Sequence, residues 1–241
     1  SELKEMYVHP QFHKQIDMEA VALYFKFGYV PAPHAIFQGV RKLMPGHYLK
    51  YNIKRRTFTI HQYWNVMDFY EKPKLKISYN EAKDELRNIL KSAFEYRMVA
   101  DVPVGVFLSG GYDSVGVTAM LQKDRTEKLK TFTIGFPVGN NEAPVAKEIA
   151  HYLDTEHTEY ICTYNDCREI LPNLSFYYDE PFSDNSAVPT ILVSQLARQK
   201  VKVALSADAG DETFAGYNSY VSLAKVLKFI NNNPYIIRKK I

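Results

Sequence analysis

The distribution of apolar residues predicts alternating helices and strands through most of the chain. Ser78 and Glu81 form the pattern of a capping box, and the apolar positions that follow them recur at helical spacing, which predicts a helix over about 79–98. Further helical patterns lie at 114–122, 142–153, 166–177 and 187–199. Short apolar runs predict strands at 104–108, 131–136, 157–162 and 201–205.

This alternation indicates an α/β fold built on a doubly wound parallel sheet. Strands of five or six residues separated by helices of ten or more are typical of parallel neighbours, which need long crossover connections. Ligands of such sheets bind at the carboxyl ends of the strands. We therefore expect the chemistry in the loops that follow the apolar runs.

The first part of the chain has a different pattern, rich in aromatic residues and proline. Extended pieces at 47–51 and 56–61, with Pro45-Gly46 as a turn signal, predict a small β-rich remnant of another domain. A charged stretch at 71–76 that contains Pro73 follows it. We expect a domain boundary near residue 70, with domains 1–70 and 71–241.

Composition narrows the classes of function. Hydrophobic residues make up 46% of the 241 residues, which suffices for a core, and 30 basic against 27 acidic residues give a net charge of only +3. Without a basic run interleaved with aromatics, or an apolar run of about 18 residues, we expect neither a nucleic-acid partner nor a membrane span. Cys162 and Cys167 lack a companion Cys/His cluster and the seven histidines lack ligand spacing, which favours a reducing, cytoplasmic compartment without a zinc site.

The clearest chemical motif is Ser109-Gly110-Gly111-Tyr112-Asp113-Ser114, which stands between an apolar run and a predicted helix. Glycines there let the backbone approach an anion, and free N–H groups at the helix start point toward it, so a phosphate is the expected ligand. The carboxylate of Asp113 would repel phosphate unless a divalent cation lay between them, which implies Mg²⁺. The alternative is a plain turn from strand to helix.

A second motif, Ser206-Ala207-Asp208-Ala209-Gly210-Asp211-Glu212, also follows an apolar run. Three carboxylates in a tight loop repel one another unless a cation or hydrogen-bond donors compensate them. We expect Asp113 and Asp211 to share the Mg²⁺ ion. The alternative is a solvated acidic turn that caps the next helix.

These two motifs resemble those of the N-type ATP pyrophosphatases, and within them the asparagine synthetase family. The resemblance implies a fold of the adenine nucleotide alpha hydrolase type. It also implies that ATP is bound by its β and γ phosphates at the first motif, with Leu108 and Ile134 contacting adenine through their backbones. It places Ser206 and Ala207 in the nucleotide site and gives Asp208 a proton-transfer role during attack by the amine. The nucleotide-binding residues of the first motif are Ser109, Gly110, Gly111, Asp113 and Ser114.

Two further segments bear on this resemblance. Ala207 and Ala209 replace glycines of the family's second motif, and alanine costs about 1 kcal/mol or more where φ must be positive. The stretch 179–186 resembles the acceptor side of the family's cleft and suggests that Asp184 contacts the substrate. The alternative there is a helix cap, in which Asn185 or Ser186 begins the following helix.

The N-terminal part resembles the end of the family's glutaminase domain, through the stretches 27–33 and 42–48. No residue matches that domain's nucleophilic cysteine, so the resemblance implies ammonia supplied by a glutaminase domain absent from this chain. The family's catalytic lysine would fall beyond Ile241, and none of Lys225, Lys228, Lys239 and Lys240 lies in a matching motif. We therefore expect the second domain to be truncated at its C-terminus.

The resemblance implies ATP-dependent amidation of a carboxylate through an acyl-adenylate, with release of AMP and pyrophosphate. Aspartate is the favoured acceptor, and a sugar carboxylate or another acceptor remains open. A nucleotide-binding module without turnover is a second alternative, and a tRNA-modifying pyrophosphatase is a weaker one because no basic RNA surface is evident. A homodimer also remains open.

Overall fold

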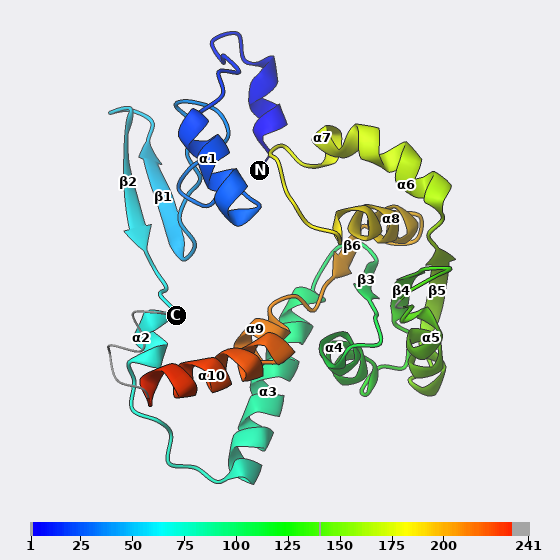
Figure 1. Cartoon of the computed structure of the whole chain (residues 1–241). Coiled ribbons are helices and arrows are strands. Elements are labelled where there is room, and N and C mark those ends of the chain that lie inside the picture. Colours follow the sequence, from blue (N-terminus) through cyan, green and yellow to red (C-terminus); the bar gives the residue numbers. More distant parts are fainter. Residues whose placement is uncertain (1, 140, 233–241) are drawn as a thin grey trace. The chain divides into compact units, whose positions relative to one another are not determined.

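The computed structural model describes residues 2–139 and 141–232 (Figure 1). The chain divides into two compact units. The first unit comprises 1–83 and 163–191, and the second comprises 84–162 and 192–241. The expected domain boundary near residue 70 stays a prediction.

The second unit is built on a four-stranded parallel sheet in the order β5-β4-β3-β6. Its strands are β3 (Val104–Phe107), β4 (Lys130–Gly135), β5 (Glu156–Ile161) and β6 (Val203–Leu205). The chain builds outward from β3 through β4 to β5 and then returns to the other side of β3 with β6. The predicted doubly wound parallel sheet is thereby confirmed, and its topological switch point lies between β3 and β6.

Helices cover both faces of this sheet. Side chains alternate between the two faces along each strand, so each face carries apolar residues against which helices pack. Val106 packs with residues of α4 (Tyr112–Gln122) and with Phe94 of α3 (Tyr79–Arg97). Leu108, two residues further and on the same face, packs against α5 (Ala143–Tyr152). Phe132, fully buried, packs instead with Phe107 and with Ala197 of α8 (Ala187–Arg198). The core therefore consists of one apolar layer on each face of the sheet.

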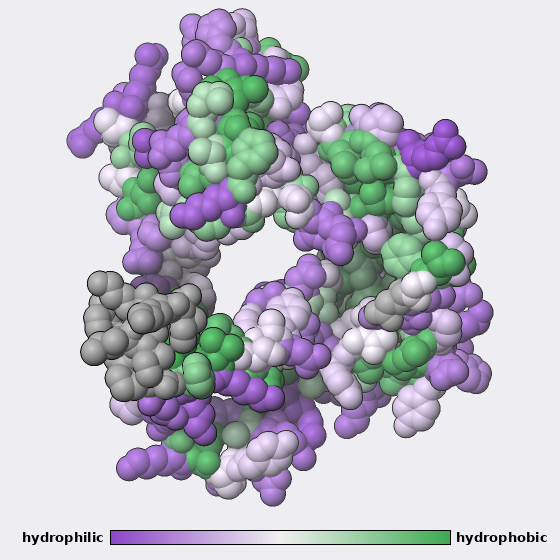
Figure 2. All heavy atoms as spheres, viewed as in Figure 1, coloured by the Kyte–Doolittle hydropathy of each residue, from purple (hydrophilic) through white to green (hydrophobic). Residues whose placement is uncertain are grey.

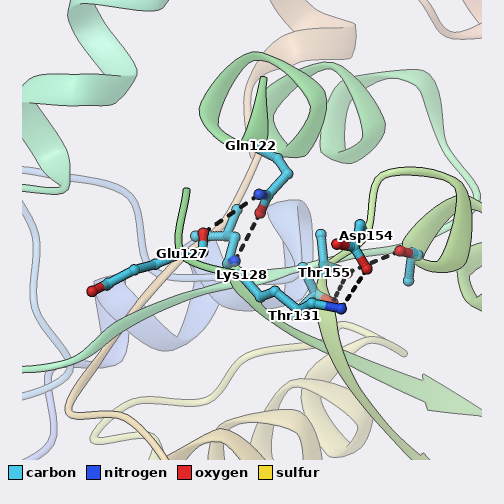
Figure 3. A network of polar contacts seen from close by, with 8 residues as sticks. Gln122, Glu127, Lys128, Thr131, Asp154 and Thr155 are labelled. Carbon is cyan, nitrogen blue, oxygen red and sulfur yellow. Dashed lines mark hydrogen bonds and ion pairs between the residues drawn. The ribbon is translucent and has the colours of Figure 1, made fainter. Parts of the chain in front are cut away.

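Hydrogen bonds and an ion pair connect the segments at the end of the sheet where β4 and β5 begin (Figure 3). At the end of α4, the Gln122 side chain accepts a hydrogen bond from Leu129 N–H at 2.7 Å and donates to the Glu127 carbonyl at 3.4 Å. Lys128 pairs with Asp154 just before β5. This is the edge opposite to the loops that follow β3 and β6, and it serves to close the crossover connections.

The short helix α9 (Gly210–Phe214) and the longer helix α10 (Asn218–Asn231) follow β6. The predicted capping box at α3 is confirmed, since Ser78 N–H donates to Glu81 at 2.8 Å and Glu81 N–H donates to Ser78 Oγ at 3.3 Å. None of the helices within 2–139 and 141–232 combines the length and the apolar character needed to cross a bilayer.

The first unit contains the predicted hairpin, in which β1 and β2 pair antiparallel from His47↔Gln62 to Asn52↔Thr57. A helix that the sequence did not predict precedes it, α1, which is capped by Asp17 and ends at Gly28 in the left-handed conformation. Met18 and Phe25 of α1 are exposed. Figure 2 shows apolar surface, in green, near the top of the view. The elements of this unit are η1 (Leu3–Val8), α1 (Met18–Phe27), β1 (His47–Asn52), β2 (Thr57–Gln62), α2 (Met67–Tyr70), α6 (Tyr164–Ile170), η2 (Leu171–Asn173) and α7 (Leu174–Tyr177).

The prediction of one continuous helix over 166–177 is wrong. It is divided into α6, the 3₁₀ turn η2 and α7. Pro172 stands at the break, where it lacks the N–H needed to continue a helix. Its start is also earlier than predicted, because Thr163 and Asp166 form a capping box.

Candidate functional site

The two loops singled out in the sequence meet at the switch point of the sheet. β3 pairs directly with β6, so the loops that follow them leave adjacent strand ends. The Asp113 carboxylate of the first loop lies against Gly210 of the second, where an added Cβ would stand only 2.2 Å from Asp113 Oδ2. The predicted convergence of the two loops is confirmed, and ligands of doubly wound sheets bind at such a point.

A cavity of about 410 Å³ lies where the loops converge. Asp113 and Asp208 both line it, together with Ser206, Ala207 and residues of α3 and α4. Leu108, Ile134, Asp211 and the stretch 109–111 are not part of its lining. The cavity therefore collects two of the predicted carboxylates, while the phosphate-loop glycines lie outside it.

Hydroxyl groups organise the first loop. Ser109 Oγ and Ser114 Oγ are 2.8 Å apart, and Ser114 Oγ accepts a hydrogen bond from Ser109 N–H at 3.0 Å. Ser109 Oγ also accepts from Gly111 N–H at 3.2 Å. Ser109 and Ser114 thus close the loop on itself, which gives these two residues a structural part besides the predicted one.

The start of α4 has the character of an anion site. Gly111 is its N-cap without a side-chain capping bond, and the first N–H groups of a helix have no acceptor inside the helix. Gly110 N–H donates to the carboxylate of Glu142 at 3.1 Å, so the loop holds one anionic oxygen already. Sequence reasoning missed Glu142, although an acidic residue directly before Ala143-Pro144 at a helix start was a visible signal.

The three carboxylates of the second loop turn toward different neighbours. Glu212 accepts a hydrogen bond from Tyr217 OH at 2.9 Å, which raises the pKa of Tyr217 to about 12. The Asp211 carboxylate lies against Gly216, where an added Cβ would stand 1.9 Å from Asp211 Oδ1. Asp208 alone of the three lines the cavity shared with Asp113.

Of the two alanines that replace glycines, only Ala209 takes a conformation that favours glycine. Its φ is 72° and its ψ is 7°, in the left-handed region, and it stands directly before α9. Ala207 is not among the residues with positive φ, and it packs against the apolar cluster around Val106. The expected strain therefore lies at position 209.

The residues present fit a magnesium ion bound together with phosphate. Within 2–139 and 141–232, no group of three or more His, Cys, Asp or Glu side chains is arranged to hold a metal. Magnesium commonly takes one or two protein carboxylates and fills its other positions with water and phosphate oxygens, so a larger cluster is not required. The pairing of Asp113 with Asp211 stays a prediction.

The backbone at the ends of β3 and β4 bears on the predicted adenine contacts. Leu108 N–H donates to the Phe132 carbonyl at 2.9 Å, and the Leu108 carbonyl accepts from Thr133 Oγ1. Leu108 therefore has only the second lone pair of its carbonyl to offer. The peptide groups of Ile134 point to the same side of β4 as those of Phe132, which is the side of β3. β3 pairs with β4 only as far as Phe107↔Phe132, so it does not reach Ile134. The backbone of Ile134 is therefore better placed than that of Leu108 for the predicted adenine contact.

Asp184 lies in the first unit, in the irregular segment before α8. Its Oδ1 accepts a hydrogen bond from Ser186 N–H at 2.7 Å, and bonds to Ser186 hold the pKa of the Asp184 carboxyl below its usual value. The capping alternative expected Asn185 or Ser186 to begin the following helix. α8 begins at Ala187 and the Ser186 carbonyl accepts a hydrogen bond from Thr190 N–H at 2.9 Å, so Ser186 stands at the start of the helix, as that alternative expected. Contact of Asp184 with a substrate stays a prediction.

Comparison of the sequence with known proteins identifies the family of this chain. The sequence model of the asparagine synthase family matches residues 85–235, which contain both loops. The chain belongs to the asparagine synthase family. A glutamine amidotransferase domain also matches residues 1–64.

Relatives of this chain include two proteins that are named asparagine synthetases. A Methanocaldococcus jannaschii protein, provisionally named asparagine synthetase [glutamine-hydrolyzing] 2, is 36% identical over 99% of this chain and 46% of its own length. Asparagine synthetase [glutamine-hydrolyzing] 1 of Bacillus subtilis is 35% identical over 86% of this chain and 32% of its own. The chain thus spans less than half the length of these relatives.

Among solved structures, the ammonia-dependent NAD synthetase of Campylobacter jejuni matches with a TM-score of 0.38 and 13% identity. The match covers 59% of this chain and 62% of that protein.

Proposed function

We propose that this chain carries the nucleotide-binding part of an enzyme that uses ATP to convert a carboxylate into an amide, with release of AMP and pyrophosphate. The observation that carries the proposal is the contact of Asp113 with Gly210 at the switch point, between the two motifs of the family. Aspartate is the proposed acceptor because the relatives bear the name of asparagine synthetases.

In this proposal the first loop binds the β and γ phosphates. Amides at the start of α4 would donate to phosphate oxygens, and the hydroxyls of Ser109 and Ser114 preserve the shape of the loop. Asp113 and Asp211 would hold Mg²⁺. That ion, when bound, neutralises the developing charge on the phosphates. Ile134 would bond adenine through its backbone.

The reaction consists of two transfers. A carboxylate oxygen of the acceptor attacks the α-phosphorus of ATP, and the bond to pyrophosphate breaks. Ammonia then attacks the carbonyl carbon of the acyl-adenylate, AMP leaves with the electron pair of the broken C–O bond, and Asp208 accepts a proton from the nitrogen. This role is supported by the position of Asp208, which lines the same cavity as Asp113.

The proposed nitrogen source is glutamine. Residues 1–64 match a glutamine amidotransferase domain, and we propose that 1–70 is the end of that domain and 71–241 is part of the synthetase domain. Ammonia released by the rest of the amidotransferase domain would serve as the attacking amine.

The test uses the full-length protein with ATP, Mg²⁺, aspartate and ammonium, and measures AMP and pyrophosphate. We expect Asp113→Asn to reduce pyrophosphate release at least about a hundredfold, because it removes a charge that holds the metal and leaves the size of the side chain unchanged. Asp124→Asn is the matched control, since Asp124 is exposed and pairs with Lys91. Unchanged activity in Asp113→Asn would remove Asp113 from the site.

The acceptor is tested in the same assay. Amide formation on a uronic acid nucleotide but not on aspartate would replace aspartate by a sugar carboxylate. Tight binding of ATP by the full-length protein without AMP from any carboxylate would favour a nucleotide-binding module and refute the enzyme.

A further inference from the structure

The segment that contains Asp184 has little regular structure of its own. Residues 178–186 lie between α7 and α8 without a helix or strand. Such a segment lacks the backbone ladder that fixes a helix or a strand, so its conformation depends on contacts with neighbouring parts of the chain. Those contacts, within the first unit, come from residues that match the amidotransferase domain.

Glu180 makes the most extensive of these contacts. Its Oε1 accepts a hydrogen bond from Ile36 N–H at 2.7 Å, and its Oε2 pairs with Lys42 Nζ. The Lys42 ammonium also donates to the Val30 carbonyl. The Glu180 side chain is 16% exposed and that of Lys42 is 34% exposed, so water screens this pair less than a surface pair.

Two further contacts flank Glu180. The Asp179 carboxylate, 12% exposed, accepts from Leu3 N–H and lies 3.8 Å from Lys4 Nζ. On the other side, Ser183 N–H donates to the Gly28 carbonyl at 2.8 Å, directly before Asp184. The segment is thus attached at positions 179, 180 and 183 to residues 3–42.

We propose that Glu180, through its pair with Lys42, is a positioning residue that couples ammonia supply to amide formation. The inference rests on the proposed function and deepens it. Because the amidotransferase part fixes the segment that bears Asp184, acceptor binding and the state of the amidotransferase part influence each other through the same contacts. Such an influence is reciprocal by thermodynamic linkage.

The experiment uses the full-length protein and the variants Glu180→Gln and Lys42→Met. Each removes one charge of the pair and keeps the approximate size of the side chain. We measure glutamate formed per AMP with glutamine as nitrogen source, and the rate with saturating ammonium. Lys128→Met is the matched control, since Lys128 pairs with Asp154 at the exposed edge of the second unit.

We expect both variants to raise glutamate formed per AMP, because amide formation no longer follows the supply of ammonia. They should also weaken acceptor binding by about fivefold or more, the range of a typical coupling between binding sites. The rate with ammonium should change far less, and Lys128→Met should change neither. The charge-swapped double variant, Lys42→Glu with Glu180→Lys, should recover part of the coupling, and it also serves if a single variant does not fold.

An unchanged ratio in both single variants would overturn the coupling. Equal loss of the glutamine-driven and ammonium-driven rates would overturn it too, because that pattern indicates a merely structural role. If the unmodified protein forms no AMP with ammonium, the proposed function fails instead.

Discussion

Ala209→Gly tests the conformation of the loop that follows β6. Ala209 has φ 72° and ψ 7°, a region in which an L-residue is strained by about 1–2 kcal/mol and glycine is not. Glycine also adds conformational freedom to the unfolded chain, which costs about 0.4–1 kcal/mol of stability. The difference leaves a net stabilisation of about 0.5–1 kcal/mol, which raises Tm by about 1–4 °C for a chain of this size.

Ala207→Gly is the control, two residues away in the same loop. Ala207 does not have positive φ and its methyl group packs against the cluster around Val106, so glycine there relieves no strain and loses a contact. We expect a lower Tm, by about 2–4 °C. Calorimetry of both variants gives the comparison. A fall in Tm of Ala209→Gly equal to that of Ala207→Gly would show that position 209 is not left-handed.

Two further changes probe the site and the sheet. Gly210→Ala should weaken Mg²⁺-dependent ATP binding, measured by calorimetric titration, because its methyl group would displace the Asp113 carboxylate. Asp124→Asn, at an exposed residue outside the cavity lining, should bind normally, and equal affinities of the two variants would contradict the contact. Half-buried His157 accepts or donates a 3.0 Å hydrogen bond with Thr131 Oγ1, and burial lowers its pKa. The stability that neutral His157 contributes is therefore present above the unfolded pKa of about 6.5 and is lost as pH falls through the folded pKa. His157→Asn should therefore make the denaturant midpoint less dependent on pH between pH 7 and 5. A midpoint that depends on pH as strongly as in the unmodified protein would exclude His157 as the cause.

Much of the second unit could be predicted because its signals are local. The apolar runs that became β3, β4 and β5 each depend on neighbours in sequence. The same holds for the capping pair Ser78 and Glu81 in the first unit. The convergence of the two loops also followed, since parallel topology brings strand ends to one edge.

The rest depends on contacts that sequence spacing does not encode. Glu142 bonds Gly110 across 32 residues, and the positive φ of Ala209 belongs to an alanine, a residue that gives no sign of it. Pro172 is a signal for the break after α6 that the prediction from helical periodicity did not use.

The position of β3 between β4 and β6 sets an order for folding. Gly105 pairs with Lys130, about 25 positions later, and on its other side with Ala204, about 100 positions later. On the ribosome, β3 and β4 can associate long before β6 emerges, since domains form from the N-terminus during synthesis and distant pairing is slow. The switch point can consequently be completed only after β6 has been synthesised, and a nucleotide bound there would stabilise the folded state over the unfolded one.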